Sequence, residues 1–328
     1  MAERELTFAE AIREALAEEM RRDSRVFIIG EDVAEAGTPF KVLSGLVEEF
    51  GVKRVIDSPI SEPGFSGLGV GAAMTGLRPV VDLMFGDFLT LAMDQIVNQA
   101  AKIHYMSGGK MKAPIVFRTT LGATRRSAAQ HSQSLQAWVS HVPGLKVVIP
   151  STPYDAKGLL KSAIRDENPV VYMEDKMMYK LKGPVPAEDY TIPFGVADVK
   201  RVGEDITFVA TSSMVQVALG AADKLHEIGI SAEVVDPRTT APLDKQTLIE
   251  SAKKTSRAIV IDEGYERYGV TAELASVIAD GAFYYLDAPV KRMGALDVPV
   301  PFSPVLEDIT VPTEETVFQM AKTLCGRN

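Results

Sequence analysis

Apolar residues recur along this chain in two alternating patterns. Short apolar runs predict buried strands at residues 25–29, 54–57, 80–85, 114–119, 146–149 and 170–174. Amphipathic stretches near 87–106 and 153–165 predict helices between them, and Thr7-Phe-Ala-Glu10 is a capping box that predicts an earlier helix start. Such alternation indicates a mostly parallel sheet covered on both faces.

A second alternating region follows, with strands predicted at 207–210, 232–235, 258–261 and 290–293 and helices near 214–228, 244–254 and 269–280. Residues 176–193 hold three prolines, a glycine and charged residues, a composition typical of an exposed linker. We therefore expect an α/β fold of two doubly wound domains, at 1–185 and 201–328, joined by a linker at 186–200. The length of 328 residues also predicts about two domains.

Composition narrows the class of partners. The chain is 46% hydrophobic and 24% charged, as ordinary globular proteins are, and its net charge of −9 argues against a nucleic-acid partner. We find no secretory signal and no apolar stretch that approaches the roughly 20 residues of a membrane span. The single cysteine, Cys325, cannot pair within the chain. We expect a cytoplasmic protein without a membrane partner.

Candidate chemistry begins at Glu62, which lies between a short apolar strand and a run of small residues that extends to Gly76. A carboxylate in such surroundings is expected to be shielded from water, and shielding raises its proton affinity. The alternative is a first-turn carboxylate stabilised by the helix dipole. The glycines at 67, 69 and 71 also satisfy a loose dinucleotide-binding pattern, but two prolines separate them from the strand and they are typical of a helix body.

The stretch Val55-Ile-Asp-Ser-Pro-Ile-Ser-Glu62, with Gly67-Leu-Gly-Val-Gly-Ala-Ala-Met-Thr-Gly-Leu-Arg-Pro79, resembles the β-subunit of the thiamine-diphosphate-dependent first component of 2-oxo acid dehydrogenase complexes. The resemblance covers nearly the whole chain. It is clear again in five further stretches, at 94–102, 105–109, 128–133, 143–148 and 155–166. It implies a pyrimidine-binding domain followed by a transketolase C-terminal-like domain.

The resemblance assigns roles to four residues. Glu62 would exchange a proton with the cofactor's aminopyrimidine, Phe88 would pack against that ring, Glu31 would lie near it, and His131 would lie in the active site near substrate. Each residue has a simpler alternative, since Phe88 could be an ordinary core residue, Glu31 a solvated loop carboxylate and His131 a loop histidine that holds backbone groups. The basic residues Lys110, Lys112, Arg118, Arg125 and Arg126 could attract a carboxylate substrate, or form a solvated face.

The resemblance also implies a structural potassium site formed by the carbonyls of Ile115, Ala163 and Ile164 with Asp166 and Asn168. The alternative is a helix end closed by an Asx turn. No Gly-Asp-Gly stretch occurs for magnesium and diphosphate binding. We therefore expect an α-subunit to hold magnesium and the diphosphate of thiamine diphosphate, in an α₂β₂ heterotetramer that works with a lipoyl-bearing acyltransferase.

The expected activity is oxidative cleavage of pyruvate or acetoin with acyl transfer to a lipoyl group. Branched-chain 2-oxo acids are an alternative substrate class, and three short stretches, at 84–88, 118–123 and 190–195, lean towards acetoin. Three other functions stay open on the sequence: a nicotinamide-dependent dehydrogenase, a non-catalytic subunit of the same fold, and half of a split transketolase that acts on sugar phosphates.

Overall fold

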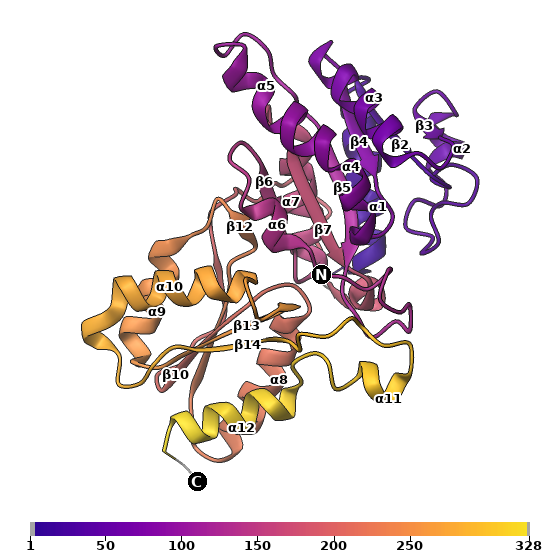
Figure 1. Cartoon of the computed structure of the whole chain (residues 1–328). Coiled ribbons are helices and arrows are strands. Elements are labelled where there is room, and N and C mark those ends of the chain that lie inside the picture. The colour runs from indigo at the N-terminus through magenta and orange to yellow at the C-terminus, as the bar shows by residue number, and fades with distance from the viewer. Residues whose placement is uncertain (1–3, 327–328) are drawn as a thin grey trace. The chain divides into compact units, whose positions relative to one another are not determined.

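The computed structural model, which describes residues 4–326, divides into two units that each contain their own sheet (Figure 1). Unit 1 holds the described residues of Met1–Leu121 and Trp138–Phe194, and unit 2 holds those of Gly122–Ala137 and Gly195–Asn328. The expected pair of α/β domains is confirmed, but the division differs from the predicted boundaries because residues 122–137 group with unit 2.

The sheet of unit 1 is parallel. Its strands follow the order β6 (Lys146–Val148), β7 (Val170–Asp175), β5 (Val116–Leu121), β4 (Arg78–Asp82), β2 (Val26–Gly30) and β3 (Val55–Asp57). These are the strands that the apolar runs predicted. The run at 80–85 ends earlier than expected because the Asp82 carboxylate accepts a hydrogen bond from the Met84 N–H at 2.9 Å and Met84 is left-handed.

Helices cover both faces of this sheet. α1 (Phe8–Arg22) and α7 (Pro153–Arg165) share one core with Val26, Val80 and Tyr172. The predicted capping box of Thr7 and Glu10 starts α1. On the other face, α3 (Glu62–Met74) packs so closely on β4 that a Cβ at Gly69 would lie 2.5 Å from Val81. The short helix α2 (Leu46–Phe50) also belongs to unit 1, and α6 (Gln136–Ser140) begins in unit 2 and ends in unit 1.

The helix expected near 87–106 is interrupted. It comprises a 3₁₀ turn η1 (Gly86–Phe88), α4 (Leu89–Met93), a π-helical stretch η2 (Asp94–Ala100) and α5 (Ala101–Met106). A π turn inserts one extra residue, and the apolar spacing in the sequence predicted a helix here without distinguishing α-helical from π-helical turns.

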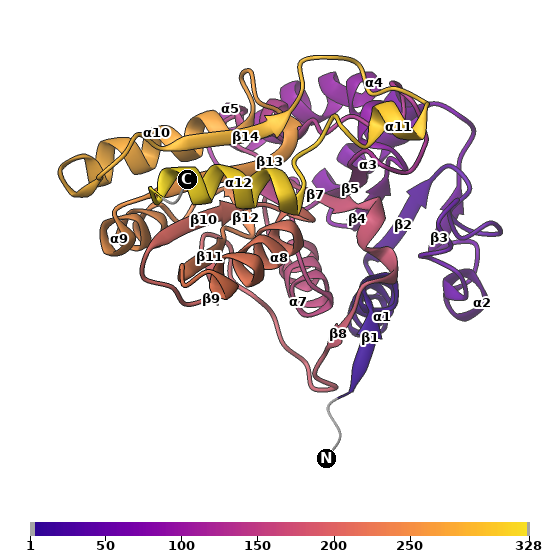
Figure 2. The ribbon, with the colours of Figure 1, turned by 90° about the horizontal axis from the view of Figure 1, so that it is seen from below.

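Residues 176–193 do not form the exposed linker that their composition predicted. They form the 3₁₀ helix η3 (Lys176–Lys180) and β8 (Lys182–Pro184), which pairs antiparallel with β1 (Glu5–Thr7) near the N-terminus (Figure 2). Met178, Tyr179, Val185 and Ile192 are buried in unit 1. Prolines and charges set the irregular backbone here, while the interspersed apolar side chains anchor it, so unit 1 extends to Phe194 rather than ending at 185.

Unit 2 is built on a five-stranded sheet in the order β14 (Lys291–Ala295), β13 (Ala258–Tyr265), β10 (Ile206–Ala210), β11 (Ala232–Asp236) and β9 (Asp198–Arg201). Only β9 is antiparallel. It was not predicted, and it begins within the expected linker and ends one residue beyond it. α8 (Met214–Glu227) and α12 (Glu314–Leu324) share one core, and α9 (Lys245–Thr255) and α10 (Val270–Ala282) share another. The shorter elements are β12 (Thr239–Ala241), η4 (Phe283–Tyr285) and α11 (Pro304–Glu307).

Within residues 4–326, every helix falls short of the length and apolar character that crossing a membrane requires.

Candidate functional site

The strand order of unit 1 creates a switch point between β2 and β4. From β2 the chain proceeds to β3 on one side, and from β4 it proceeds to β5 on the other side. Ligands of open α/β sheets bind outside the carboxyl ends of strands at such a point. The two strands are tightly apposed there, because a Cβ at Gly30 would lie 2.6 Å from the carbonyl oxygen of Asp82. Glu31 directly follows β2, and the aromatic loop 83–88 follows β4.

Glu62 is the first residue of α3, and its side chain is buried, with a relative exposure of 5%. Among the residues that the structure describes, no group donates a hydrogen bond to its carboxylate, whose oxygens keep a little contact with solvent. The start of α3 stabilises a negative charge through the helix dipole, which was the simpler alternative for this residue. A buried carboxylate without a direct donor is nevertheless unfavourable, and a bound ligand with a proton or a donor would compensate it.

Glu31 is half-buried at the same end of the sheet. Its pKa is raised above the ordinary value, first by burial and then by the negative charges of Asp32 and Glu62. The dependence on Glu62 indicates that these two carboxylates are close enough to interact. Like charges that share a site favour retention of a proton on one of them. Both residues lie at the carboxyl ends of paired strands, since Glu31 follows β2 and Glu62 comes five residues after β3.

Aromatic rings follow β4 in the same unit. Phe88 packs edge-to-face on Phe85 with ring centroids 5.7 Å apart, and Phe85 packs in the same way on Phe40 at 5.5 Å. The ammonium group of Lys176 lies 5.6 Å from the centre of the Phe85 ring. Phe85 and Phe88 are both half-buried, so the loop offers two adjacent rings, of which the sequence analysis chose Phe88.

A buried ion cluster supports this loop, and the sequence analysis missed it. Arg118 binds both oxygens of Glu174 at 2.6 and 2.7 Å and also pairs with Asp82. The Tyr179 hydroxyl donates to Glu174 at 2.9 Å. Burial opposes the charge on Arg118, but the two carboxylates outweigh it and hold the Arg118 pKa above its usual range. Carboxylates directly at strand ends, such as Asp82, were the available signal.

Three of the five residues of the predicted basic stretch are paired with carboxylates. Arg118 is buried in the cluster just described, Lys112 pairs with Glu167 at 3.0 Å, and Arg126 pairs with Glu307 and Asp308. Acidic partners supplied by remote parts of the chain neutralise these residues, and the sequence pattern alone could not reveal them.

His131 belongs to unit 2, in the segment Gly122–Ala137. Its side chain is half-buried, and its backbone N–H donates to the Ala128 carbonyl at 3.4 Å. Glu31, Glu62 and Phe88 belong to unit 1, so the predicted site residues are divided between the two units. The simpler alternative for His131, a loop histidine, describes its backbone setting equally well.

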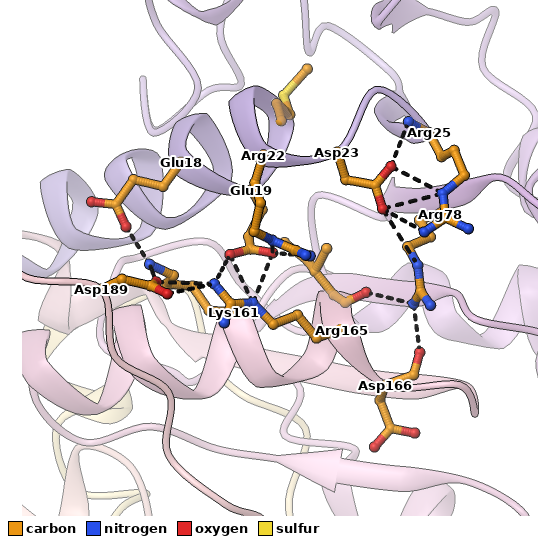
Figure 3. Close-up of polar contacts among 12 residues, drawn as sticks. Glu18, Glu19, Arg22, Asp23, Arg25, Arg78, Lys161, Arg165, Asp166 and Asp189 are labelled. Carbon is orange, nitrogen blue, oxygen red and sulfur yellow. Dashed lines mark hydrogen bonds and ion pairs between the residues drawn. The ribbon is translucent and has the colours of Figure 1, made fainter.

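The predicted potassium ligands lie around the end of α7. The Asp166 carboxylate accepts from the Asn168 backbone N–H at 2.8 Å, which is the Asx turn of the alternative interpretation. Arg78 donates to the carbonyl oxygens of Ile164 and Asp166, both at 3.0 Å (Figure 3). Lys146 pairs with the Asp166 carboxylate.

The other two predicted potassium ligands also accept backbone hydrogen bonds. The Ile115 carbonyl accepts from the Val170 N–H at 2.9 Å, and the Ala163 carbonyl accepts from the Asp166 N–H at 3.3 Å. The oxygens are thus assembled near one helix end, but protein donors already contact each of these carbonyls and two cationic side chains lie beside them. An ion there would share these oxygens with Arg78 and Lys146.

No cluster of three or more His, Cys, Asp or Glu side chains suited to a metal ion occurs within residues 4–326. The glycine pattern at 67–71 lies in the body of α3, not in a turn after a strand, so it lacks the context that phosphate binding requires.

Two protein-family models match this chain. Residues 4–182 match the pyrimidine-binding domain of transketolase, and residues 195–317 match the transketolase C-terminal domain. A solved split-gene transketolase, described as an inactive β4 tetramer, has a TM-score of 0.79 with 23% sequence identity and covers 98% of both chains. At that identity the likeness establishes the fold alone.

Closer relatives come from curated proteins. The β-subunit of acetoin:2,6-dichlorophenolindophenol oxidoreductase from Bacillus subtilis is 50% identical and covers 98% of both chains. The pyruvate dehydrogenase E1 component β-subunit of Rickettsia felis is also 50% identical over 98% of both chains. The 2-oxoisovalerate dehydrogenase β-subunit of B. subtilis is 48% identical and covers 92% of this chain and 93% of its own.

Proposed function

This chain belongs to the β-subunits of the thiamine-diphosphate-dependent first components of 2-oxo acid and acetoin dehydrogenases, and from that premise we propose that it forms the half of an active site that binds the cofactor's aminopyrimidine. The observation that carries the proposal is the buried carboxylate of Glu62, which has no hydrogen-bond donor among residues 4–326 and starts a helix at the ligand-binding end of the sheet.

Glu62 is the residue that we assign to proton transfer. Thiamine diphosphate, when bound, supplies the nucleophilic carbon that cleavage of a 2-oxo acid or of acetoin requires. The Glu62 carboxyl group would hold and return a proton at a ring nitrogen of the aminopyrimidine. General acid–base assistance of this kind contributes about 10²–10⁴ in rate. Glu31 would lie near the cofactor, and Phe85 and Phe88 would pack against the aromatic ring. We propose that His131 lies in the active site near the substrate.

The substrate is pyruvate or acetoin in this proposal, with branched-chain 2-oxo acids as the alternative. The relatives named for acetoin and pyruvate are equally similar to this chain, at 50% identity, and the branched-chain relative follows at 48%. The acyl product would pass reductively to the lipoyl group of an acyltransferase. Overall identity does not discriminate among these substrates, so product analysis has to do so.

An α-subunit would supply the magnesium and diphosphate sites, in an α₂β₂ assembly. Large apolar side chains exposed along α3, α4 and α5 support a partner surface on unit 1: Leu68, Leu91, Tyr105 and Met106. An ordinary monomer rarely exposes many such side chains on neighbouring elements. A structural potassium ion at the end of α7 and a cytoplasmic location stay predictions of the sequence, and no catalytic step is assigned to the ion.

The test is the exchange Glu62→Gln in the chain co-expressed with an α-subunit that carries Gly-Asp-Gly. We expect the complex to assemble and its turnover to fall about 10²–10⁴-fold, because the amide cannot transfer the proton. Turnover is measured with an artificial electron acceptor for pyruvate, acetoin and a branched-chain 2-oxo acid in parallel. A ketose phosphate serves as the substrate of the transketolase alternative.

The matched control is Glu48→Gln, the same exchange at an exposed position of α2 in the same unit. It should retain full turnover. Full activity of the Glu62→Gln complex would show that the chain is a non-catalytic subunit.

A further inference from the structure

The segment that carries His131 has an unusual backbone. Thr124, Arg126 and Ala128 have positive φ angles of 66°, 60° and 59°. Left-handed backbone is unfavourable for residues with side chains, so it persists only where surrounding contacts fix it. Three such residues within five positions therefore require an external source of order. That source lies in unit 2, to which the segment Gly122–Ala137 belongs.

Glu307 fixes the middle of the segment. Its side chain is fully buried, and its carboxylate accepts the Arg126 backbone N–H at 3.1 Å and the Arg126 guanidinium at 2.7 Å. Asp308 accepts the same guanidinium at 2.6 Å. The Glu307 carboxylate, at the end of α11, thus binds both the backbone and the side chain of Arg126, a residue with left-handed backbone.

Two neighbouring residues at the carboxyl-terminal part of β13 fix the ends of the segment. Glu263 accepts the Ala123 backbone N–H at 2.6 Å. The side-chain amide nitrogen of Gln136 donates to both carboxylate oxygens of Asp262, at 2.9 and 2.8 Å. Both carboxylates are buried. A buried carboxylate is unfavourable unless donors compensate it, and here the segment supplies one donor group to each of the two carboxylates.

We propose that Asp262, Glu263 and Glu307 form a carboxylate clamp that positions the segment 122–137, and through it His131, before substrate binds. The three are positioning residues, because none of them is assigned to contact substrate or cofactor. The catalytic part of this inference rests on the proposed role of His131. The structural part of the inference is that the three carboxylates hold the segment 122–137 in place. It does not depend on the role of His131, and it has its own test.

The mechanical test is limited trypsin digestion of the full chain, because Arg125 and Arg126 are cleavage sites within the clamped segment. We expect Glu307→Gln to raise the rate of cleavage after Arg125 and Arg126 by about tenfold, the order expected when a charge-assisted hydrogen bond that opposes local opening is lost. Fragment masses identify the cut. Cleavage after Lys253 and Lys254, in α9 of the same unit, reports any general loss of structure.

Glu227→Gln, at an exposed position at the end of α8, is the matched control and should leave the pattern unchanged. Asp262→Asn tests the contact with Gln136, at the other end of the segment. If that variant does not fold, Glu307→Gln remains informative, because Glu307 lies outside the sheet. Wild-type resistance in Glu307→Gln would overturn the clamp, whatever the function of the chain.

The catalytic test is a double-mutant cycle in the complex with the α-subunit. Glu307→Gln should lower kcat more than it changes KM, and in a His131→Ala background it should cause no further loss, because both changes remove the same contribution. Additive losses would assign Glu307 a purely structural role and overturn the positioning inference. Unchanged turnover of His131→Ala alone would refute the proposed role of His131, while the trypsin result would still decide the clamp.

Discussion

Gly69 and Gly71 lie two positions apart in α3, and the structure gives them opposite surroundings. A Cβ at Gly69 would lie 2.5 Å from Val81 and 3.1 Å from Ile115, whereas a Cβ at Gly71 would meet no atom within 4 Å. Close packing on β4 therefore explains why position 69 is a glycine. Packing within the chain gives no such reason for the glycine at position 71. The spacing of the glycines could not distinguish these two cases, because it reports neither neighbour.

Alanine at these two positions should change stability in opposite directions. Gly71→Ala should raise the free energy of unfolding of the isolated chain by about 1 kcal/mol, since alanine favours a helix interior. Gly69→Ala should lower it by about 1–3 kcal/mol, because overpacking against β4 outweighs the helix preference. Urea denaturation followed by circular dichroism measures both. Equal shifts of the same sign would contradict the packing argument.

Glu62 shows how far single residues can be interpreted. The sequence predicted a shielded carboxylate at the start of a helix, and the structure confirms its burial and its place in the first turn of α3. Arg118 shows the opposite outcome, because its local neighbours are uninformative and its partners Asp82 and Glu174 come from two other strands. Burial follows from local composition, whereas ion pairing depends on residues far apart in the chain.

At the scale of elements, α1 and α7 are joined by an ion network (Figure 3). Lys161 of α7 is almost fully buried and pairs with Glu18 of α1, and Arg165 binds Glu19 at 2.6 Å. Asp189, from the segment that was expected to be a linker, binds both cations. The helices were predictable from periodicity, but a buried lysine on the packed face was not.

Removal of Asp189 should destabilise the protein in a pH-dependent way. Hydrogen bonds from Lys161 and Arg165 lower its pKa from 3.8 to about 2 in the folded state. A lowered pKa means that its stabilisation is complete above about pH 4 and is lost as the pH falls towards 2. Asp189→Asn should therefore lower the unfolding free energy at pH 7, and the difference from wild type should shrink between pH 4 and pH 2.

Urea denaturation at several pH values checks this prediction. Glu188→Gln, an exposed neighbour, is the control and should have no effect. Because the Asp189 side chain is 63% exposed, the effect should be modest and should weaken at high salt. A difference that is the same at pH 7 and pH 2.5 would exclude the ion-pair explanation.

At the scale of the whole molecule, we propose that the chain supplies one half of a divided cofactor site. The sequence lacks Gly-Asp-Gly, and the part that the structure describes offers no group of three metal-ligating side chains. The candidate pyrimidine residues are present in unit 1. This division is consistent with a β-subunit whose cofactor is held jointly with a partner.

Cofactor titration tests this division. We expect calorimetry with thiamine diphosphate and magnesium to give binding heat with the α–β complex and none with the isolated chain, because we assign the diphosphate and metal contacts to the α-subunit. NADH fluorescence should not change in either sample, since the glycine pattern forms the body of α3. Tight binding of either cofactor by the isolated chain would contradict the split site.

The sequence by itself determined the two α/β folds, most of the strands and helices of both units, and the burial of Glu62. Periodicity, capping residues and composition are local properties, and each of these features depends on residues that are close in the chain. The tertiary structure alone decided that residues 122–137 join unit 2, that residues 176–194 pack into unit 1, and that Arg118 and Arg126 are neutralised. Those outcomes depend on carboxylates and apolar surfaces that the topology brings together from distant parts of the chain, as it does for Arg126 and Glu307. No local sequence pattern encodes that proximity.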